Sequence, residues 1–434
     1  MPLVTNCADI ADATARGASA HNQTNKLSQS DSPFLLCVLA IYFAVRLPWL
    51  LVVPLTDAPD EANHLWVINF IASHLRLPVQ ADLIAAGPAA LYGALPTLGY
   101  FPSVLSELVL SGAARFGTLI VGAITVPIAL AVAGEIFPRR SLCWYALPLL
   151  IALHPQLVFV QSYANTDATA ITFTSAVLYI IVASFRKPLS LPMAAAAGML
   201  FGLAALSKHT AFSVGPAVFG GILLACAAHK MSWQATLTRL CLSAAALSGI
   251  VVPYLVRNYF EFSGDILGTK TMYRMWAVIL PRSGDGAIIN PWPPVKSLSW
   301  WRYIWFDYWG LFGYMNKYLW RPIYFAYGLL CAGAIYGWVR AKLVPLASKR
   351  ALWLTLLAFP LCNLVAMVAA TLMNVSGPHG RYLFPSEIAI CVLLLEGMRR
   401  AGSTGEKLIV TWLALNALVS VGAFIALYGN RVHF

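Results

Sequence analysis

Long runs of apolar residues, separated by shorter polar connections, dominate the pattern of this chain. The runs occupy residues 34–53, 115–136, 142–160, 168–184, 189–207, 210–228, 239–257, 320–339, 351–373, 382–398 and 408–428. Each has close to the roughly 20 residues that an α-helix needs to cross the hydrocarbon core of a bilayer. The runs are continuous, whereas strands of a membrane β-barrel alternate between apolar and polar residues. The pattern therefore predicts an all-α polytopic membrane protein with about eleven transmembrane helices.

Composition supports the membrane class and argues against several others. Hydrophobic residues make up 59% of the 434 residues, and the mean hydropathy is +0.72, which a soluble core could not absorb. The net charge of +12 comes mainly from Lys and Arg between the apolar runs, so it indicates orientation in a membrane and not a nucleic-acid partner. The eight cysteines lie almost entirely within the runs and lack paired spacing, which argues against a disulfide framework and a zinc site.

Basic residues gather on alternate connections between the apolar runs. The clusters are Arg139 with Arg140, Arg186 with Lys187, Lys230 with Arg239, the segment from Arg340 to Arg350, and Arg399 with Arg400 and Lys407. The positive-inside rule assigns such connections to the cytoplasm. We therefore expect a flexible cytoplasmic tail at residues 1–33, a transmembrane domain at 34–428 and a short outer C-terminus at 429–434. Two long loops, residues 54–114 and 258–319, then lie on the extracytoplasmic face.

The first outer loop opens with an acidic cluster at residues 56–64, in a chain of which only 11% is charged. Its ionisable residues are Asp57, Asp60, Glu61 and His64. Apolar residues recur at helical spacing from Glu61 to Leu75, which predicts an interfacial helix with Asp60 and His64 on one face. The cluster is either a helix cap with solvated charges, or a site where Asp60 acts as a general base and Glu61 or His64 assists it or binds a divalent cation.

The second outer loop is rich in tryptophan. Its indoles are Trp292, Trp300, Trp301, Trp305, Trp309 and Trp320. Tryptophan is typical of the headgroup layer, where the ring is buried and the N–H stays hydrated. We therefore expect this segment to lie in the membrane interface.

A second polar group lies between the runs 142–160 and 168–184, on the same predicted face. It contains His154, Asn165, Thr166 and Asp167. An aspartate at the edge of the hydrocarbon costs roughly 2 to 3 kcal/mol unless it has a partner or a function. Either Asn165 and Asp167 bind a sugar hydroxyl, complete a cation site or orient the interfacial helix, or Asn165 and Thr166 cap the next helix.

Several cations occur at the outer ends of the apolar runs, against the positive-inside rule. They are Arg115, Lys208, Arg257 with Asn258 beside it, and Arg381, together with Arg46 inside the first run. Phosphate binding gives one reason for such a set, because Arg presents a planar fork and Lys a point charge to an anionic group. Snorkelling to lipid phosphates is the alternative for any single residue.

A series of segments, in this order, resembles the GT-C superfamily of integral membrane glycosyltransferases and a large bacterial family of polytopic proteins within it. The segments are Pro59–His64, His154–Gln156 with Asn165–Asp167, Leu206–Lys208, Arg257–Tyr259 with Gly264–Gly268, Tyr308–Gly313, and Gly380–Pro385. Together they extend over about residues 34 to 400. The resemblance implies a GT-C-like bundle with interfacial helices in the first outer loop.

The resemblance also implies a reaction and a location. Enzymes of this superfamily transfer a sugar from a polyprenyl-phosphate donor to an acceptor at the outer face of the membrane, usually with inversion at the anomeric carbon. By resemblance, this chain is a hexosyl- or pentosyltransferase of the bacterial cytoplasmic (inner) membrane that serves cell-envelope polysaccharide biosynthesis. Its partners would be membrane lipids, the donor, and a glycan, lipid or protein acceptor, with no nucleic acid.

The roles implied for single residues follow from the matching segments. Asp60 is the general base, with Glu61 and Asp167 as further catalytic acids; Asp60, Glu61 and His64 are the candidate ligands of a Mg²⁺ or Mn²⁺ ion. Lys208, Arg257 and Arg381 are the implied donor-phosphate contacts. Together with the polar residues and cations singled out from the sequence pattern, the candidate substrate-binding residues are Arg46, Asp57, Arg115, Asn165, Lys208, Arg257, Asn258, Arg381 and Tyr382. Many members carry a large soluble C-terminal domain, whereas only residues 429–434 follow the last run here, so we expect the two outer loops to recognise the acceptor.

A mechanism without a covalent intermediate follows from a single base. A carboxylate that takes the proton of an attacking hydroxyl accelerates such a step by about 10² to 10⁴, and positive charge assists departure of the phosphate. Two other functions stay open. Inverted repeats and charges near the middle of the spans would favour a transporter or flippase of lipid-linked saccharides. A non-catalytic subunit of a polysaccharide assembly system would keep the fold and lose the chemistry.

Overall fold

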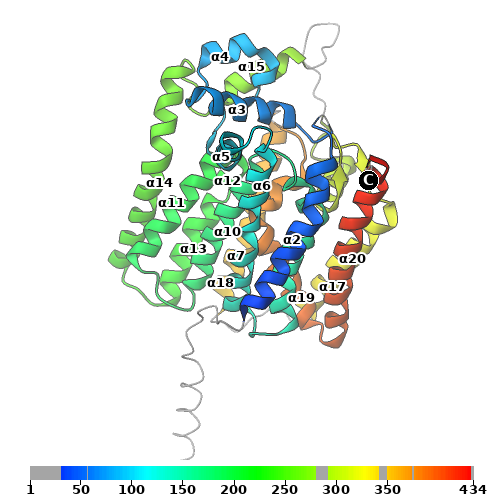
Figure 1. The fold of residues 1–434 in the computed structure, drawn as a ribbon. Coiled ribbons are helices and arrows are strands. Elements are labelled where there is room, and N and C mark those ends of the chain that lie inside the picture. The colour runs from blue at the N-terminus through cyan, green and yellow to red at the C-terminus, as the bar shows by residue number, and fades with distance from the viewer. Residues whose placement is uncertain (1–30, 56, 280–291, 342–348, 374–375, 432–434) are drawn as a thin grey trace, which may run out of the picture.

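The computed structural model describes residues 31–431 except 56, 280–291, 342–348 and 374–375. Most of the tail predicted at 1–33, part of the Arg340–Arg350 cluster, and residues 432–434 of the predicted C-terminus lie outside the described residues. The described chain is a bundle of long helices, closed at one end by the shorter helices α3, α4 and α15 (Figure 1). The only strands within the described part of the chain are two short ones.

Each predicted apolar run folds as one helix or as two consecutive helices. These helices are α2 (Ser32–Val52), α6 (Ala114–Ala123) with α7 (Thr125–Ile136), α8 (Leu142–Leu153) with α9 (Pro155–Val160), α10 (Asp167–Ala183), α11 (Leu191–Ser207), α12 (His209–Phe212) with α13 (Gly215–Ala228), α14 (Trp233–Glu261), α17 (Arg321–Arg340), α18 (Arg350–Leu372), α19 (Glu387–Arg400) and α20 (Ser403–Tyr428). Among the described residues, seven helical stretches are long and apolar enough to cross a membrane. The chain is therefore a multi-pass membrane protein, as predicted.

Four of the predicted runs form shorter helices than a full crossing needs. They are the runs at 142–160, 168–184, 189–207 and 382–398. Pro155 divides the first of them, because a proline ring excludes helical backbone at the residue before it. The last begins late because Gly380–Ser386 forms the 3₁₀ segment η5 ahead of α19. The second of these interruptions, η5, contributes Arg381 and Tyr382 to the lining of a cavity.

Small residues allow the long helices to pack closely. A β-carbon on Gly198 of α11 would lie 2.0 Å from the carbonyl oxygen of Ser243 in α14. A β-carbon on Gly337 of α17 would lie 1.8 Å from the carbonyl oxygen of Gly397 in α19. Because apolar burial does not drive association within a bilayer, this close backbone approach is typical of membrane helix pairs.

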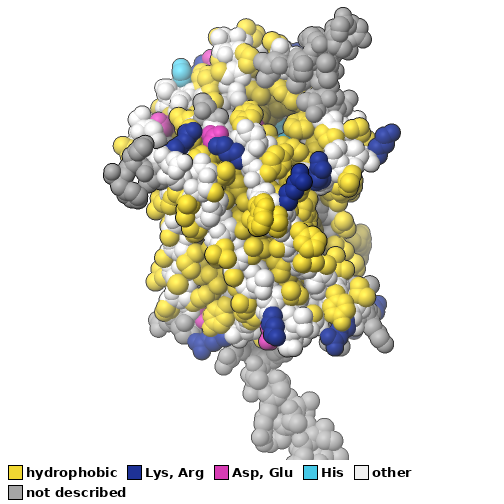
Figure 2. Space-filling model, turned by 90° about the vertical axis from the view of Figure 1, so that its right-hand side faces the viewer, with side chains coloured by type: hydrophobic (Ala, Val, Ile, Leu, Met, Phe, Trp, Pro, Cys, Tyr) yellow, Lys and Arg dark blue, Asp and Glu magenta, His cyan; other side chains and the backbone are white. Residues whose placement is uncertain are grey.

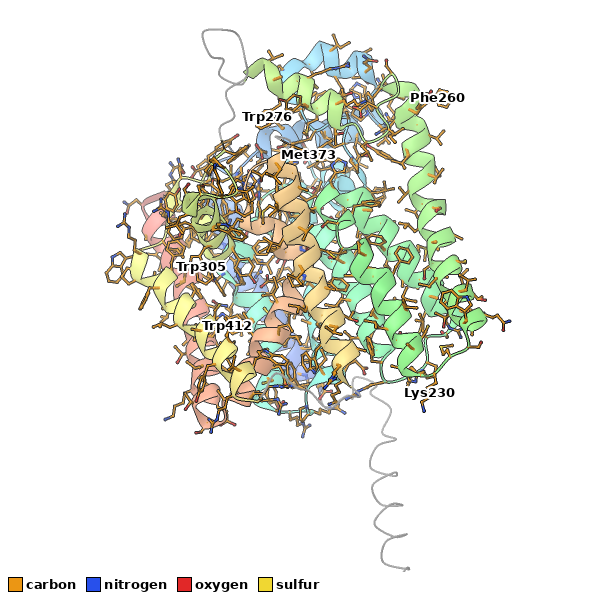
Figure 3. All side chains as sticks on the ribbon, turned by 180° about the vertical axis from the view of Figure 1, so that it is seen from behind. Lys230, Phe260, Trp276, Trp305, Met373 and Trp412 are labelled. Carbon is orange, nitrogen blue, oxygen red and sulfur yellow. The ribbon has the colours of Figure 1, made fainter. Side chains whose placement is uncertain are left out.

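The two ends of the bundle differ in charge and in the length of their connections. At one end Arg139, Arg186, Lys349 and Arg399 come together from separate connections. Lys230 lies at this end, and Phe260, at the end of α14, lies at the other (Figure 3). Hydrophobic side chains cover the middle of the face in Figure 2, with Lys and Arg towards both ends. The basic connections thus share one end and the two long loops share the other; which end faces the cytoplasm stays a prediction.

The first long loop contains the predicted interfacial helix, α3 (Glu61–His74). After it come α4 (Gln80–Ala86), the 3₁₀ segments η2 (Gly87–Ala90) and η3 (Leu98–Tyr100), and α5 (Phe101–Val109). The second long loop contains α15 (Thr269–Ile279), α16 (Leu298–Trp309) and a hairpin of β1 (Leu311–Phe312) and β2 (Lys317–Tyr318). The hairpin pairs Leu311 with Tyr318 and Phe312 with Lys317. A last 3₁₀ turn, η6 (Gly429–Arg431), follows α20.

The tryptophan-rich segment is only partly where the sequence predicts it. Trp301 and Trp320 are exposed, but Trp300 and Trp309 of α16 are buried in the protein. Trp309 stacks on Tyr327 of α17 with ring centroids 4.1 Å apart. An interfacial position for every indole is therefore wrong: α16 packs one face against the bundle, and that face carries the buried rings.

Candidate active site

A cavity of about 570 Å³ lies where the two long loops meet the bundle. Residues of α3, the first loop, α15 and the β1–β2 turn line it on one side. The start of α10, the α11–α12 junction, α18 and η5 line it on the other. The Asp, Glu, Lys and Arg side chains among the lining residues are Asp60, Asp167, Lys208 and Arg381. Segments that are far apart in the sequence thus place two carboxylates and two cations around one space.

Asp60 precedes α3 in an unusual backbone conformation. Its φ of 60° and ψ of 6° are left-handed, which Asp tolerates better than most residues. Its side chain makes no capping hydrogen bond, so the helix-cap interpretation of this carboxylate is wrong. Instead, Oδ1 accepts a hydrogen bond of 3.3 Å from the hydroxyl of Tyr314, and Oδ2 lies 3.6 Å from a guanidinium nitrogen of Arg381. The side chain is 21% exposed and therefore accessible from the cavity.

His64 lies one helical turn after Asp60, as the spacing predicts. Its backbone N–H donates to the carbonyl oxygen of Asp60, and its Nδ1 shares a 2.6 Å hydrogen bond with the hydroxyl of Tyr100. The ring stacks on Tyr92 with centroids 4.8 Å apart. Burial lowers the pKa of His64 to about 4, against a smaller opposing effect of Asp60. The imidazole is therefore neutral near pH 7 and forms part of a wall of aromatic rings.

Asp167 and Lys208 form an ion pair at the cavity wall. Lys208 follows the last residue of α11, and Asp167 is the first residue of α10. The side-chain oxygen of Asn165 accepts the backbone N–H of Asp167 at 2.7 Å, and its amide donates to the carbonyl oxygens of Val160 and Tyr163. Asn165 thus orders the turn before α10, which agrees with the capping interpretation, and it does not line the cavity.

Arg381 brings a guanidinium group to the cavity from η5. Its side chain is 8% exposed, one terminal nitrogen donates to the hydroxyl of Tyr163 at 3.0 Å, and Nε has no hydrogen-bond partner among the described residues. Tyr382, next in the chain, also lines the cavity. A buried guanidinium N–H without an acceptor is costly. Because the side chain lines the cavity, an anionic ligand there would face the charge of the guanidinium group.

Asp307 of α16 holds the backbone of this segment. Its buried carboxylate accepts the backbone N–H of Arg381 at 3.2 Å and the amide of Gln156 at 3.3 Å. Burial raises the pKa of Asp307 to about 6, against the opposing effect of Arg381. At Gly380 a β-carbon would lie 2.2 Å from the backbone nitrogen of Tyr308. The close backbone contact at Gly380 and the hydrogen bonds of Asp307 therefore fix the backbone position from which the Arg381 side chain extends.

Glu61 and Arg115, predicted as a catalytic acid and a substrate contact, bind each other away from the cavity. Two nitrogens of Arg115 donate to the two carboxylate oxygens of Glu61 at 2.7 and 2.6 Å. Glu61 also accepts the backbone N–H of Ala164 at 2.9 Å, and Arg115 donates to the carbonyl oxygens of Leu50 and Val53. The pair joins the end of α2, the start of α3 and the turn before α10. It supports the site and does not line it.

Four more predicted substrate-binding residues are engaged within the protein. Arg46 is buried in α2 and donates to Gln161 and to the carbonyl oxygen of Ala152. Asp57 accepts hydrogen bonds from Lys317 and Tyr428. Arg257 and Asn258 donate to carbonyl oxygens of the first loop. These contacts connect helix ends to the loops, because a buried or half-buried charge needs partners wherever it lies.

Several lining residues have no distinct signal in the sequence. Tyr92, Tyr100, Tyr314, Trp276 and His379 all line the cavity. They lie in connections without helical periodicity, or on a short helix of the second loop, and aromatic residues are common throughout this chain. The quoted segments Tyr308–Gly313 and Gly380–Pro385 stop next to Tyr314 and His379 without including them.

The predicted metal ligands are not brought together. The carboxylate of Glu61 binds Arg115, away from Asp60 and His64. Within the described ranges no group of three or more His, Cys, Asp or Glu side chains could hold a metal ion. Asp167 is paired with Lys208, and Asp60 lies beside Arg381, so protein cations balance the charge of both cavity carboxylates. The residues present do not fit the predicted three-ligand site, and no step below passes through a metal.

Comparison with solved structures identifies the fold. The chain is similar to ArnT from Cupriavidus metallidurans bound to undecaprenyl phosphate, with a TM-score of 0.56 and 14% identity over 86% of this chain and 61% of that one. It is also similar to the oligosaccharyltransferase AglB from Archaeoglobus fulgidus in complex with an inhibitory peptide and a dolichol-phosphate, with a TM-score of 0.50 and 14% identity over 93% of this chain and 56% of that one.

The chain shares the fold of these two proteins, which confirms the GT-C-like fold predicted from the sequence. The chain spans less than two thirds of the length of either protein. No protein-family model matches the sequence, and no curated protein sequence matches it.

Proposed function

We propose that this protein is a membrane glycosyltransferase that moves a sugar from a polyprenyl-phosphate donor to a hydroxyl acceptor in this cavity. One observation carries the proposal: Asp60, Asp167, Lys208 and Arg381 line a single cavity where the loops meet the membrane helices. A lipid-linked donor places its phosphate at the membrane boundary, where such cations would hold it. The GT-C-like fold supports the same class of reaction.

Lys208 and Arg381 are the proposed donor-phosphate contacts. Arg381 brings a guanidinium group to the cavity wall, and Lys208 brings an ammonium to the same wall. Ala366, Met367 and Ala370 of α18 give the cavity an apolar flank towards the membrane helices. The prenyl chain would lie along this flank, which keeps its methylene groups out of water. Both cations then stabilise the negative charge that develops on the departing phosphate.

Asp60 is the proposed general base. The acceptor oxygen forms a bond to the anomeric carbon while the bond from that carbon to the phosphate oxygen breaks. The acceptor proton passes to Asp60, and the bonding electron pair leaves with the phosphate. A single displacement of this kind inverts the anomeric carbon and needs no second carboxylate close enough to act as a nucleophile. In this proposal the Asp167–Lys208 pair orients the Lys208 ammonium, so Asp167 acts through Lys208.

The finer assignments follow the sequence resemblance. They are the inner membrane of a bacterium, a cytoplasmic N-terminus, an active site on the outer face, and an acceptor in the cell envelope. The resemblance also implies a Mg²⁺ or Mn²⁺ ion, whereas the protein cations beside Asp60 and Asp167 favour transfer without one. The cluster of basic connections at the end of the bundle opposite the cavity supports the orientation, because the positive-inside rule assigns that end to the cytoplasm.

The direct test is transfer by purified protein in detergent, supplied with a panel of undecaprenyl-phosphate sugars and a lipid-extract acceptor. Mass spectrometry would follow release of free undecaprenyl phosphate. We expect release by wild-type protein and a loss of at least 100-fold in Asp60→Asn, on the order of the contribution of a general base. Asn tolerates left-handed backbone, so this variant should fold. Asp82→Asn, in the same loop but paired with Arg76 at the surface, is the matched control.

Two outcomes would contradict the proposal. If Asp60→Asn transfers sugar as fast as wild-type protein, Asp60 is not the base. If the sugar-linked lipid crosses a liposome membrane intact, with no free undecaprenyl phosphate formed, the protein moves lipid and a transporter or flippase is the better description.

A further inference from the structure

Helix α15 of the second loop is docked firmly on the first loop. Gly268, just before it, has a φ of +71°, and a β-carbon there would lie 1.9 Å from the carbonyl oxygen of Ala94. The carboxylate of Asp265 accepts the backbone N–H of Thr271 at 2.7 Å, which caps the first turn. Met275 packs against an apolar cluster that includes Leu83. Backbone contact, capping and apolar packing therefore hold α15 in one position above the bundle (Figure 1).

The neighbouring face of α15 lines the cavity. Thr269, Met272 and Trp276 recur at helical spacing, so they share one face, and all three are lining residues. Lys270 and Arg274 point away from the cavity and are exposed. Figure 3 labels Trp276 at the loop-covered end of the bundle, the end at which α18 leads into Met373. The helix therefore separates an outer polar face from an inner face that carries a large aromatic ring.

Trp276 has room for a ligand against its ring. Its aromatic neighbour is Tyr273 of the same helix, in an edge contact with centroids 6.2 Å apart. In the part of the chain that the structure describes, no aromatic ring stacks on the face of this indole. The side chain is half-buried, so its position is set by the protein while part of its surface stays free.

We propose that Trp276 is a specificity residue that stacks on the sugar ring of the lipid-linked donor. This inference rests on the proposed function. If Lys208 and Arg381 hold the donor phosphate and the prenyl chain lies along Ala366 and Ala370 of α18, the sugar extends towards the loops. There α15 forms a wall of the cavity. The face of a pyranose is covered by C–H groups, which pack well on an indole.

The test compares binding of a lipid with and without its sugar. Detergent-solubilised full-length protein would be titrated with undecaprenyl phosphate and with undecaprenyl phosphates of glucose, galactose and mannose, followed by native mass spectrometry. We expect Trp276→Ala to weaken binding of the preferred sugar-linked lipid by roughly tenfold, as an aromatic contact of about 1.4 kcal/mol would give, and to change binding of undecaprenyl phosphate less than twofold. Trp276→Phe should weaken binding of the sugar-linked lipid less than Trp276→Ala does.

Trp320→Ala is the matched control, because Trp320 is 75% exposed and does not line the cavity. The inference is overturned, and the proposed function survives, if wild-type protein binds undecaprenyl phosphate but Trp276→Ala weakens both kinds of lipid equally or neither. It is likewise overturned if no sugar improves binding over undecaprenyl phosphate in wild-type protein. If wild-type protein binds no polyprenyl phosphate, the proposed function itself fails.

Discussion

The buried pair of Glu61 and Arg115 offers the sharpest test of how the site is supported. Glu61 is fully buried and Arg115 is 9% exposed, and they share two short hydrogen bonds. Glu61→Gln keeps the shape but leaves the Arg115 charge uncompensated. Breaking a buried pair by removing one partner costs about 3 to 5 kcal/mol. Because the amide oxygen can still accept the Ala164 N–H, we expect a loss near the lower end, about 3 kcal/mol.

The measurement is unfolding by SDS in mixed micelles, followed by tryptophan fluorescence. The double variant Glu61→Gln with Arg115→Met should recover most of the lost free energy, because it removes both buried charges. Asp82→Asn breaks the exposed pair with Arg76 and should leave the midpoint almost unchanged. The reasoning is refuted if Glu61→Gln costs less than about 1 kcal/mol. It is also refuted if the loss in the double variant equals the sum of the losses measured for Glu61→Gln alone and for Arg115→Met alone.

Three further predictions concern the cavity. Arg381→Lys should raise the KM for the lipid donor at least fivefold and change the acceptor KM less than twofold, measured in the transfer assay; equal changes in both would contradict phosphate binding. Because burial lowers the pKa of His64 from 6.5 to about 4, the unfolded chain takes up a proton in this range and the folded protein does not. Stability should therefore fall as the pH drops from 6.5 to 4, and His64→Gln should flatten that decline in SDS midpoints; an unchanged slope would count against a neutral buried imidazole. Since Lys208 and Arg381 balance the cavity carboxylates, transfer should continue after exhaustive chelation, and complete loss that Mg²⁺ or Mn²⁺ restores would reinstate the metal site.

Local sequence patterns predicted where the helices lie, but they did not predict which side chains contact one another across the fold. The apolar runs located the membrane helices because a bilayer imposes a length and a polarity on whatever crosses it. Helical spacing after Asp60 predicted α3 and the shared face of Asp60 and His64, which are local properties. The cations Arg115 and Arg257 looked like Lys208 and Arg381 in sequence. Their different surroundings depend on contacts across many tens of residues, such as the one between Glu61 and Arg115.

By itself, the sequence determined the helical membrane class, the two long loops at one end of the bundle, and a set of acids and cations from which a site would be built. Tertiary structure decided which of them meet. It directed Glu61 to Arg115 and Asp57 to Lys317, and it brought Asp60, Asp167, Lys208 and Arg381 to one cavity. It also added Trp276 and Asp307, which no spacing indicated. The physical reason is that a charge needs a partner wherever it is buried, and packing alone determines whether that partner is another side chain or a ligand.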